Sequence, residues 1–190
     1  LDALRQMGAN IKLKNGYIEA SAKKLIGSNI RFDGITVTGT ENIMMAATLA
    51  QGETILTNVA KEPEIIDLAD MLNSMGANIK GAGTDQITIK GVRELSGTNF
   101  TIPADRIEAG TYLVAAAVTQ GNITIDSINP NRLMKVINMI ERSGSKISFD
   151  DNSISISMNK DRPDPVDITT APFPEFPTDM QAQFSVINAI

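Results

Sequence analysis

The sequence predicts an α/β (α+β) fold made of repeated β-α-β-α-β-β units, and three observations support this prediction. The segment Met7-Gly8-Ala9-Asn10-Ile11-Lys12 recurs letter for letter at residues 75–80, and a divergent copy occupies residues 143–147. The glycines of these copies, Gly8, Gly76 and Gly144, stand 68 residues apart. A second marker, Ala46-Ala47 followed by Gln51-Gly52, returns 69 residues later. Regular spacing across several markers indicates similar supersecondary units that stack on one another.

One complete unit is predicted between residues 29 and 89. Its first helix consists of small and apolar residues and ends before Gly52, and its second helix begins with Pro63, which suits a first helical turn. Apolar residues recur at helical spacing in the second helix, and Gly76 can adopt the left-handed backbone conformation that ends a helix. Alternating apolar residues indicate the strands. The predicted order is strand 29–32, helix 41–50, strand 53–59, helix 63–75, and strands 78–80 and 86–89.

The next unit repeats this order, with Pro130 again at the start of a second helix. Residues 1–7 have the pattern of the end of a second helix, and residues 182–190 have that of the start of a first helix. We therefore expect this chain to be a piece of a longer protein. The second unit is predicted as strand 100–102, helix 109–119, strand 122–128, helix 130–143, and strands 146–149 and 153–158.

A similar polar pattern precedes each first helix. Thr38, Asp105 and Thr178 each stand three residues before an acid or an amide, which is the spacing of a capping box. Most such patterns satisfy the free N–H groups at the start of a helix. The simplest prediction is that these three side chains cap the three first helices.

The composition excludes several classes of protein. With 42% hydrophobic and 21% charged residues, the 190 residues fall in the globular range, and no apolar run is long enough to cross a membrane. A net charge of −5 argues against general nucleic-acid binding, which needs a basic face. Cysteine and histidine are absent, which excludes disulfides, zinc fingers and Ser-His-Asp triads within these residues. We expect no metal and no cofactor.

The most distinctive stretch lies at residues 170–184, where three prolines stiffen a segment that then enters a helix. It reads Thr-Ala-Pro-Phe-Pro-Glu-Phe-Pro-Thr-Asp-Met-Gln-Ala-Gln-Phe and closely resembles the T-A-P-x-P-x-F-P-T-D-M-Q-x-Q motif of the UDP-N-acetylglucosamine enolpyruvyl transferase family. Residues 105–111 and 61–65 resemble that family's D-R-I-E-x-G-T and R/K-E-P-E-I segments. The resemblance covers the whole chain nearly without gaps.

This resemblance implies the "inside-out" α/β barrel of the enolpyruvyl transferases, in which two domains of three units each close on substrates. The family's crossover between domains falls just before the D-R-I-E segment. Residues 1–103 would then be the later part of the first domain, on the side of the nucleotide-sugar loop. Residues 104–190 would be the opening part of the second. Two incomplete domains leave apolar faces uncovered, so we expect the fragment to self-associate.

The reaction that the resemblance implies transfers the enolpyruvyl group of phosphoenolpyruvate to the 3′-hydroxyl of UDP-N-acetylglucosamine and releases phosphate. It is the first committed step of peptidoglycan synthesis, in the bacterial cytoplasm. The reaction needs a base for the hydroxyl proton, an acid for the methylene carbon, and cations for the phosphate. Asp179 matches the family's proton acceptor, and Thr178 precedes it as a substrate contact. The alternative is that both side chains only cap a helix.

Two further groups of residues are implied as contacts. Gly34, Ile35, Thr36 and Val37 align with the family's nucleotide-sugar loop, where the usual pattern has a lysine at the position of Gly34. An ordinary loop between a strand and a helix is the alternative there. A second group carries charges for inter-domain or substrate contacts, with plain surface ion pairs as the alternative. This group consists of Glu62, Glu64, Asp105, Arg106 and Glu108.

The same resemblance places the general acid, a Cys or Asp on a mobile loop, before residue 1, and further cations outside these residues. The isolated 190 residues are therefore expected to be inactive. Two other interpretations stay open. One is a shikimate-pathway enolpyruvyl transferase, which shares the fold but not the T-D-M-Q stretch, and the other is a non-catalytic repeat scaffold. Neither nucleic acid nor a membrane is expected as a partner.

Overall fold

A computed structural model describes all residues, 1–190, and the chain forms two compact units, Leu1–Thr101 and Ile102–Ile190. Each unit buries its own cluster of apolar side chains. The division lies two residues before the boundary that the resemblance implies, and the assignment of each unit to part of a domain stays a prediction. None of the helices has the length and apolar character that a membrane span requires.

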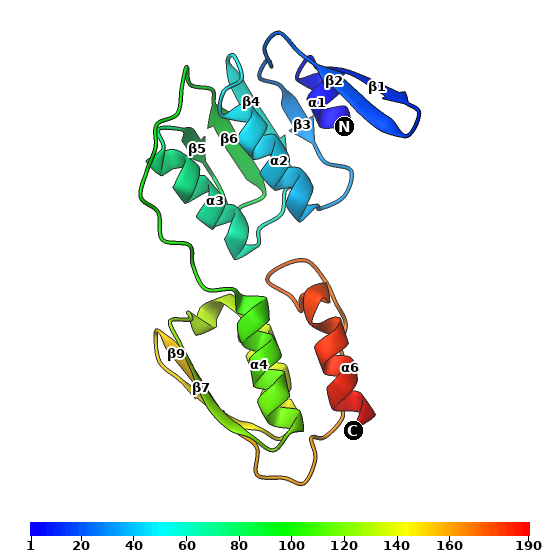
Figure 1. The fold of residues 1–190 in the computed structure, drawn as a ribbon, viewed down its shortest axis with the longest axis vertical. Coiled ribbons are helices and arrows are strands. Elements are labelled where there is room, and N and C mark those ends of the chain that lie inside the picture. Colours follow the sequence, from blue (N-terminus) through cyan, green and yellow to red (C-terminus); the bar gives the residue numbers. More distant parts are fainter. The chain divides into compact units, whose positions relative to one another are not determined.

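Unit 1 contains a four-stranded sheet in the order β3-β4-β6-β5, against which helices α2 and α3 pack (Figure 1). β3 and β4 are parallel and are joined through α2, whereas β6 pairs antiparallel with both β4 and β5. This is the predicted β-α-β-α-β-β unit, which the structure confirms. Its elements are β3 (Asn29–Arg31), α2 (Val37–Ala47), β4 (Glu53–Thr57), α3 (Pro63–Ser74), β5 (Asn78–Lys80) and β6 (Gln86–Lys90).

A short helix and an antiparallel hairpin precede this sheet: α1 (Asp2–Gln6), β1 (Asn10–Lys14) and β2 (Tyr17–Ser21). The glycine after each second helix has a left-handed backbone, with φ of +91° at Gly8, +101° at Gly76 and +99° at Gly144. Only glycine adopts this conformation without strain, which explains why it recurs at a regular spacing. The internal repeat is therefore structural.

Unit 2 repeats the arrangement with a three-stranded sheet in the order β7-β9-β8, in which all pairs are antiparallel. Helix α4 packs on β7 and β9, and α6 lies beside α4 (Figure 1). The elements are α4 (Arg106–Val118), β7 (Asn122–Asp126), the 3₁₀ turn η1 (Pro130–Arg132), α5 (Met134–Arg142), β8 (Lys146–Phe149), β9 (Ser153–Ser157), the 3₁₀ turn η2 (Thr178–Met180) and α6 (Gln181–Ala189).

Two predicted elements differ in this unit. The predicted strand at residues 100–102 is wrong, because this segment pairs with no strand and the Ile102 side chain is 72% exposed. The following Pro103 lacks the N–H group that a strand ladder uses. The predicted helix 130–143 is split, because Asn129 Oδ1 accepts from the Asn131 N–H (3.0 Å) and caps a separate turn. Leu133, with a φ of −137°, separates that turn from α5.

Candidate functional site

Asp179 lies in the turn η2, immediately before α6. The side chains of Thr178 and Asp179 are both exposed, and no side chain caps either η2 or α6. The prediction that Thr178 caps this helix is therefore wrong. The Asp179 carboxylate makes no hydrogen bond or ion pair within the chain, so it is available to a ligand.

Buried neighbours hold the backbone on both sides of Asp179. Met180 is fully buried, and its Sδ and Cε lie so close to α4 that a Cβ atom at Gly110 would be 3.0 Å from both. The rings of Phe176 and Phe184, also buried, meet edge to face with centroids 5.0 Å apart. The turn that carries Asp179 is thus fixed by tertiary packing.

The proline-rich segment before this turn is tied to the helices of the same unit. Glu175 forms an ion pair with Lys135 of α5 (2.9 Å), and the Phe173–Pro174 peptide bond is cis. The guanidinium of Arg106, at the start of α4, lies 5.9 Å from the centroid of the Phe173 ring. A cavity of about 190 Å³ lies between these groups and is lined by Arg106, Lys135 and Phe173, among others. Two of the segments that carry the family resemblance therefore meet within unit 2.

Asp105 caps α4, as predicted. Its Oδ1 accepts from the backbone N–H groups of Ile107 (2.7 Å) and Glu108 (3.2 Å). Arg106 is buried, with 6% of its surface exposed, whereas Asp105 and Glu108 are exposed. The structure thus gives Asp105 a capping role, and its role in substrate or inter-domain contacts stays a prediction.

In unit 1, the loop of Gly34 to Val37 connects β3 to α2. Thr36, not Thr38, caps the helix, because Thr36 Oγ1 accepts from the Gly39 N–H (3.2 Å). The prediction of a cap at Thr38 is wrong by two residues. Gly39 explains the shift, since a Cβ atom there would lie 2.4 Å from Thr36 Cγ2. Only a glycine lets the Thr36 side chain approach the backbone this closely.

The four residues of this loop differ in their exposure. Gly34 and Ile35 are exposed, whereas Thr36 and Val37 are half-buried, and Val37 packs against the core of unit 1. A Cβ atom at Gly34 would meet nothing within 4 Å, so the site has room for a side chain. The exposed part of the predicted loop is therefore its first half.

The Glu41 carboxyl of unit 1 lies near two other acidic side chains. Burial raises the pKa of Glu41, and the charges of Glu64 and Glu62 raise it further. Glu62 precedes α3, and Glu64 lies in its first turn. No group of three acidic side chains is arranged to hold a metal ion. In the sequence, Glu41 is only the acid three residues after Thr38, and its proximity to Glu62 and Glu64 arises from the fold.

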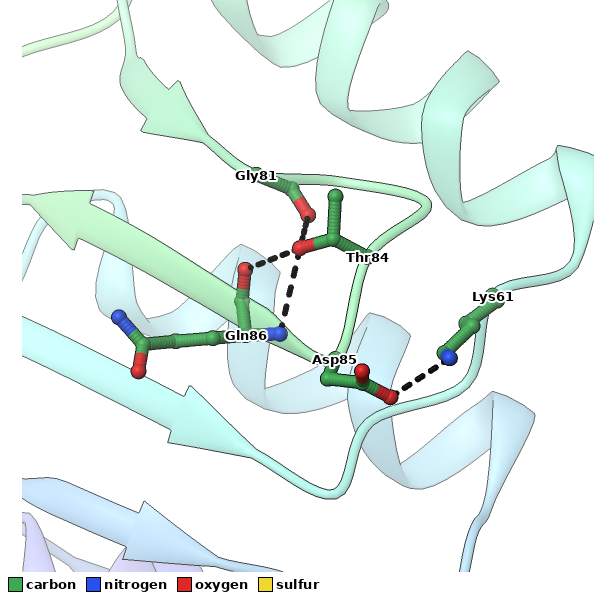
Figure 2. Close-up of polar contacts among 5 residues, drawn as sticks. All are labelled: Lys61, Gly81, Thr84, Asp85 and Gln86. Carbon is green, nitrogen blue, oxygen red and sulfur yellow. Dashed lines mark hydrogen bonds and ion pairs between the residues drawn. The ribbon is translucent and has the colours of Figure 1, made fainter.

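The segment that leads into α3 is anchored to the β5–β6 turn (Figure 2). Lys61 Nζ lies 2.6 Å from Asp85 Oδ1. The neighbouring Thr84 hydroxyl lies 2.8 Å and 2.9 Å from the carbonyl oxygens of Gly81 and Gln86, and accepts from the Gln86 N–H (3.3 Å). The Lys61–Asp85 ion pair therefore links this turn to the residue that precedes Glu62.

Two residues that hold the Asp179 turn, Gly110 and Met180, had no role in the sequence analysis. Both occur within the quoted motifs, but the contact joins positions 70 residues apart in the chain. No local pattern reports such a contact.

Comparisons with known proteins agree with this architecture. Residues 1–190 match the family described as EPSP synthase (3-phosphoshikimate 1-carboxyvinyltransferase). Among solved structures, the enolpyruvyl transferase NikO from Streptomyces tendae superposes with a TM-score of 0.85 at 18% identity, covering 99% of this chain and 48% of that one. An EPSP synthase from Acinetobacter baumannii gives a TM-score of 0.63 at 23% identity, covering 88% and 40%. These likenesses confirm the predicted α/β fold.

Curated relatives are closer in sequence. Three proteins are 54%, 53% and 50% identical to this chain over all 190 residues. They come from Ruthia magnifica, Vesicomyosocius okutanii and Halorhodospira halophila, and each is named UDP-N-acetylglucosamine 1-carboxyvinyltransferase. The chain spans 45% of the length of each of these relatives. The family match covers every residue described above. The chain therefore belongs to the EPSP synthase (3-phosphoshikimate 1-carboxyvinyltransferase) family.

Proposed function

We propose that the protein containing these residues transfers the enolpyruvyl group of phosphoenolpyruvate to the 3′-hydroxyl of UDP-N-acetylglucosamine, in the bacterial cytoplasm, as the first committed step of peptidoglycan synthesis. The observation that carries the proposal is the exposed, unpartnered Asp179 carboxylate on a turn held by buried neighbours. The names of relatives that are 50–54% identical over the full chain support the choice of substrate.

Asp179 acts as the proton acceptor in this proposal. The sugar hydroxyl oxygen bonds to C2 of phosphoenolpyruvate while its proton passes to the carboxylate, and a general acid protonates C3, which gives a tetrahedral intermediate. Loss of the C3 proton then expels phosphate and restores the double bond. A fixed turn serves this role because proton transfer requires the carboxylate within hydrogen-bond distance of the hydroxyl. We assign the general acid to residues outside this chain.

The loop of Gly34 to Val37 contributes to binding of the nucleotide sugar. The first N–H groups of a helix have no acceptor within the helix, so those of Val37 and Thr38 suit a phosphate oxygen. The exposed Ile35 offers an apolar contact beside them. Gly34 contributes no side chain where the family usually has a lysine, so we expect weaker phosphate binding here than in relatives that have it.

The charged residues complete the proposal. Arg106 and Lys135 line one cavity, where Lys135 is paired with Glu175, and we assign Arg106 to substrate or inter-domain contacts. Asp105 and Glu108, at the start of the same helix, and Glu62 and Glu64, at the start of α3, are assigned to contacts between domains. Each assignment would be tested by reversing the charge of the residue and then reversing the charge of the residue that it contacts in the other domain, which should restore the contact.

The compound that accepts the enolpyruvyl group distinguishes the proposed enzyme from a shikimate-pathway enzyme of the same family. An intact protein carrying these 190 residues is incubated with phosphoenolpyruvate and either UDP-N-acetylglucosamine or shikimate 3-phosphate. Phosphate release and the mass of the product are measured. We expect an enolpyruvyl product only with UDP-N-acetylglucosamine. A product formed only with shikimate 3-phosphate would establish the alternative, and no product with either would contradict enolpyruvyl transfer.

A further inference from the structure

We propose that Gln183 is a positioning residue that fixes the Asp179 turn on helix α4 through Thr111. This inference rests on the proposed role of Asp179 as proton acceptor. Gln183 lies in the first turn of α6 and is half-buried, and Thr111 lies on α4. The two residues are 72 positions apart in the sequence, so only the fold brings them together.

The Gln183 amide lies between the Thr111 hydroxyl and the backbone of the turn. With its oxygen toward Thr111, it accepts from Thr111 Oγ1 (2.9 Å). Its nitrogen then donates to the carbonyl oxygens of Asp179 (3.0 Å) and Met180 (3.3 Å). One side chain thus connects α4 to the carbonyl group of the residue that carries the proposed base.

The orientation of this amide follows from the groups around it. In the opposite orientation, the amide oxygen would face the two carbonyl oxygens, and all three atoms can only accept. The Thr111 hydroxyl has a second acceptor in reach, the Ile107 carbonyl oxygen at 2.7 Å. Donation to Gln183 instead leaves every polar atom of the amide with a partner, and the amide then restrains the turn.

Packing and this hydrogen bond restrain the turn in different ways. Met180 against Gly110 fixes how deeply the turn sits on α4. The amide of Gln183 acts directly on the Asp179 carbonyl group, and therefore restrains rotation of the Asp179 backbone. If the Asp179 carboxylate can move away from the substrate hydroxyl, kcat falls, because small displacements of a reacting group are costly in catalysis. We therefore expect Gln183 to affect turnover more than stability.

The experiment replaces Gln183 by Met in an intact, active protein carrying these residues. Methionine keeps the length of the side chain and removes all three hydrogen bonds of the amide. We expect kcat to fall about 10- to 100-fold and the KM for UDP-N-acetylglucosamine to change less than about threefold. Gln181→Met is the matched control, because Gln181 lies on the same helix with an exposed amide, and its kcat should stay within about twofold of the parent.

A double-mutant cycle with Asp179→Asn separates the two proposals. If Gln183 acts through Asp179, Gln183→Met should change kcat less than about twofold in the Asp179→Asn background. The positioning role is overturned if Gln183→Met lowers kcat as much in the Asp179→Asn background as in the parent, or if Gln183→Met alone has a normal kcat. Neither result bears on Asp179 as the base. A normal kcat for Asp179→Asn overturns the base itself.

A second substitution covers the case in which Gln183→Met does not fold. Thr111→Val keeps the branched shape and removes the hydroxyl that orients the amide, whereas Thr111→Ser keeps the hydroxyl. We expect Thr111→Val to lower kcat, by about tenfold, and Thr111→Ser to restore most of the loss. Equal kcat values for the two variants would overturn the proposal.

Discussion

The starts of helices α2 and α6 occupy corresponding places in the repeat, yet they are held in different ways. At α2, the side chain of Thr36 caps the helix and Gly39 makes room for it. At α6, no side chain caps the helix, and a 3₁₀ turn is held by the burial of Met180. The polar side chain in the first case is used by the fold, whereas the Asp179 carboxylate in the second is not.

This difference shows how one repeated motif can serve both stability and chemistry. A side chain that caps a helix is committed to backbone N–H groups and has little freedom to act on a substrate. Where packing fixes the start of the helix instead, an acidic side chain there does not have to bond to backbone N–H groups and can contact a substrate. At α6, the acidic residue that no capping bond engages is the candidate catalytic residue, Asp179.

The largest expected effect comes from removing the packing at α6. Met180→Ala deletes a fully buried side chain and leaves a cavity against Gly110, so we expect a loss of about 2–5 kcal/mol in the free energy of unfolding. Denaturant unfolding measures this loss. Met45→Ala, at an exposed position of α2, is the control and should cost less than about 0.5 kcal/mol. Similar losses for both variants would show that packing does not hold the α6 start.

A smaller effect is expected from removing the cap at α2. Thr36→Ala deletes the acceptor of the Gly39 N–H and should cost about 0.5–2 kcal/mol. Thr38→Ala, two residues later, should cost less than about 0.5 kcal/mol, because Thr36 and not Thr38 provides the cap. Thermal unfolding compares the two variants. A larger loss for Thr38→Ala would restore the capping position that the sequence pattern predicts.

The smallest effect concerns the acidic residues near the start of α2. Because the pKa of Glu41 is raised above its ordinary value of 4.5, the unfolded chain loses this proton first as pH rises. Stability therefore falls with pH from about 4.5 up to the raised pKa. Glu41→Gln should remove this fall and stabilise unit 1 at neutral pH, by well under about 1 kcal/mol.

Melting temperatures at acidic and neutral pH check this sign. The variant should melt higher than the parent near pH 7 and equally near pH 3, where the parent carboxyl is protonated in both states. Glu53→Gln, on strand β4 of the same unit, controls for the loss of one negative charge. A variant that melts lower than the parent at neutral pH would show that the Glu41 carboxylate is stabilised in the fold.

The sequence predicted the repeated units because their signals are local. Gly8, Gly76 and Gly144 adopt left-handed backbones where a helix ends, and Pro63 lies in the first turn of α3, so at these positions the residue type itself marks the end of the helix. The position of the cap at Thr36 escaped prediction because the spacing from Thr38 to Glu41 fits a capping box equally well. The outcome depended on the absence of a side chain at Gly39.

The support of the candidate site could not be predicted in the same way. Asp179 and Thr178 were found through a motif, but the contacts of Met180 with Gly110 and of Gln183 with Thr111 join distant segments. The missing strand at residues 100–102 has a similar cause, since strand formation depends on a neighbour that this segment lacks. Long-range contacts of this kind appear only in the folded chain.

The most direct test of this account is the turnover number and the stability of Asp179→Asn in an intact protein that carries these residues. Because the carboxylate caps no helix, we expect both Asp179→Asn and Asp179→Ala to change the free energy of unfolding by less than about 1 kcal/mol. Because an amide cannot accept the hydroxyl proton, kcat of Asp179→Asn should fall about 10²- to 10⁴-fold. A kcat within about threefold of the parent would contradict the role of Asp179 as the base.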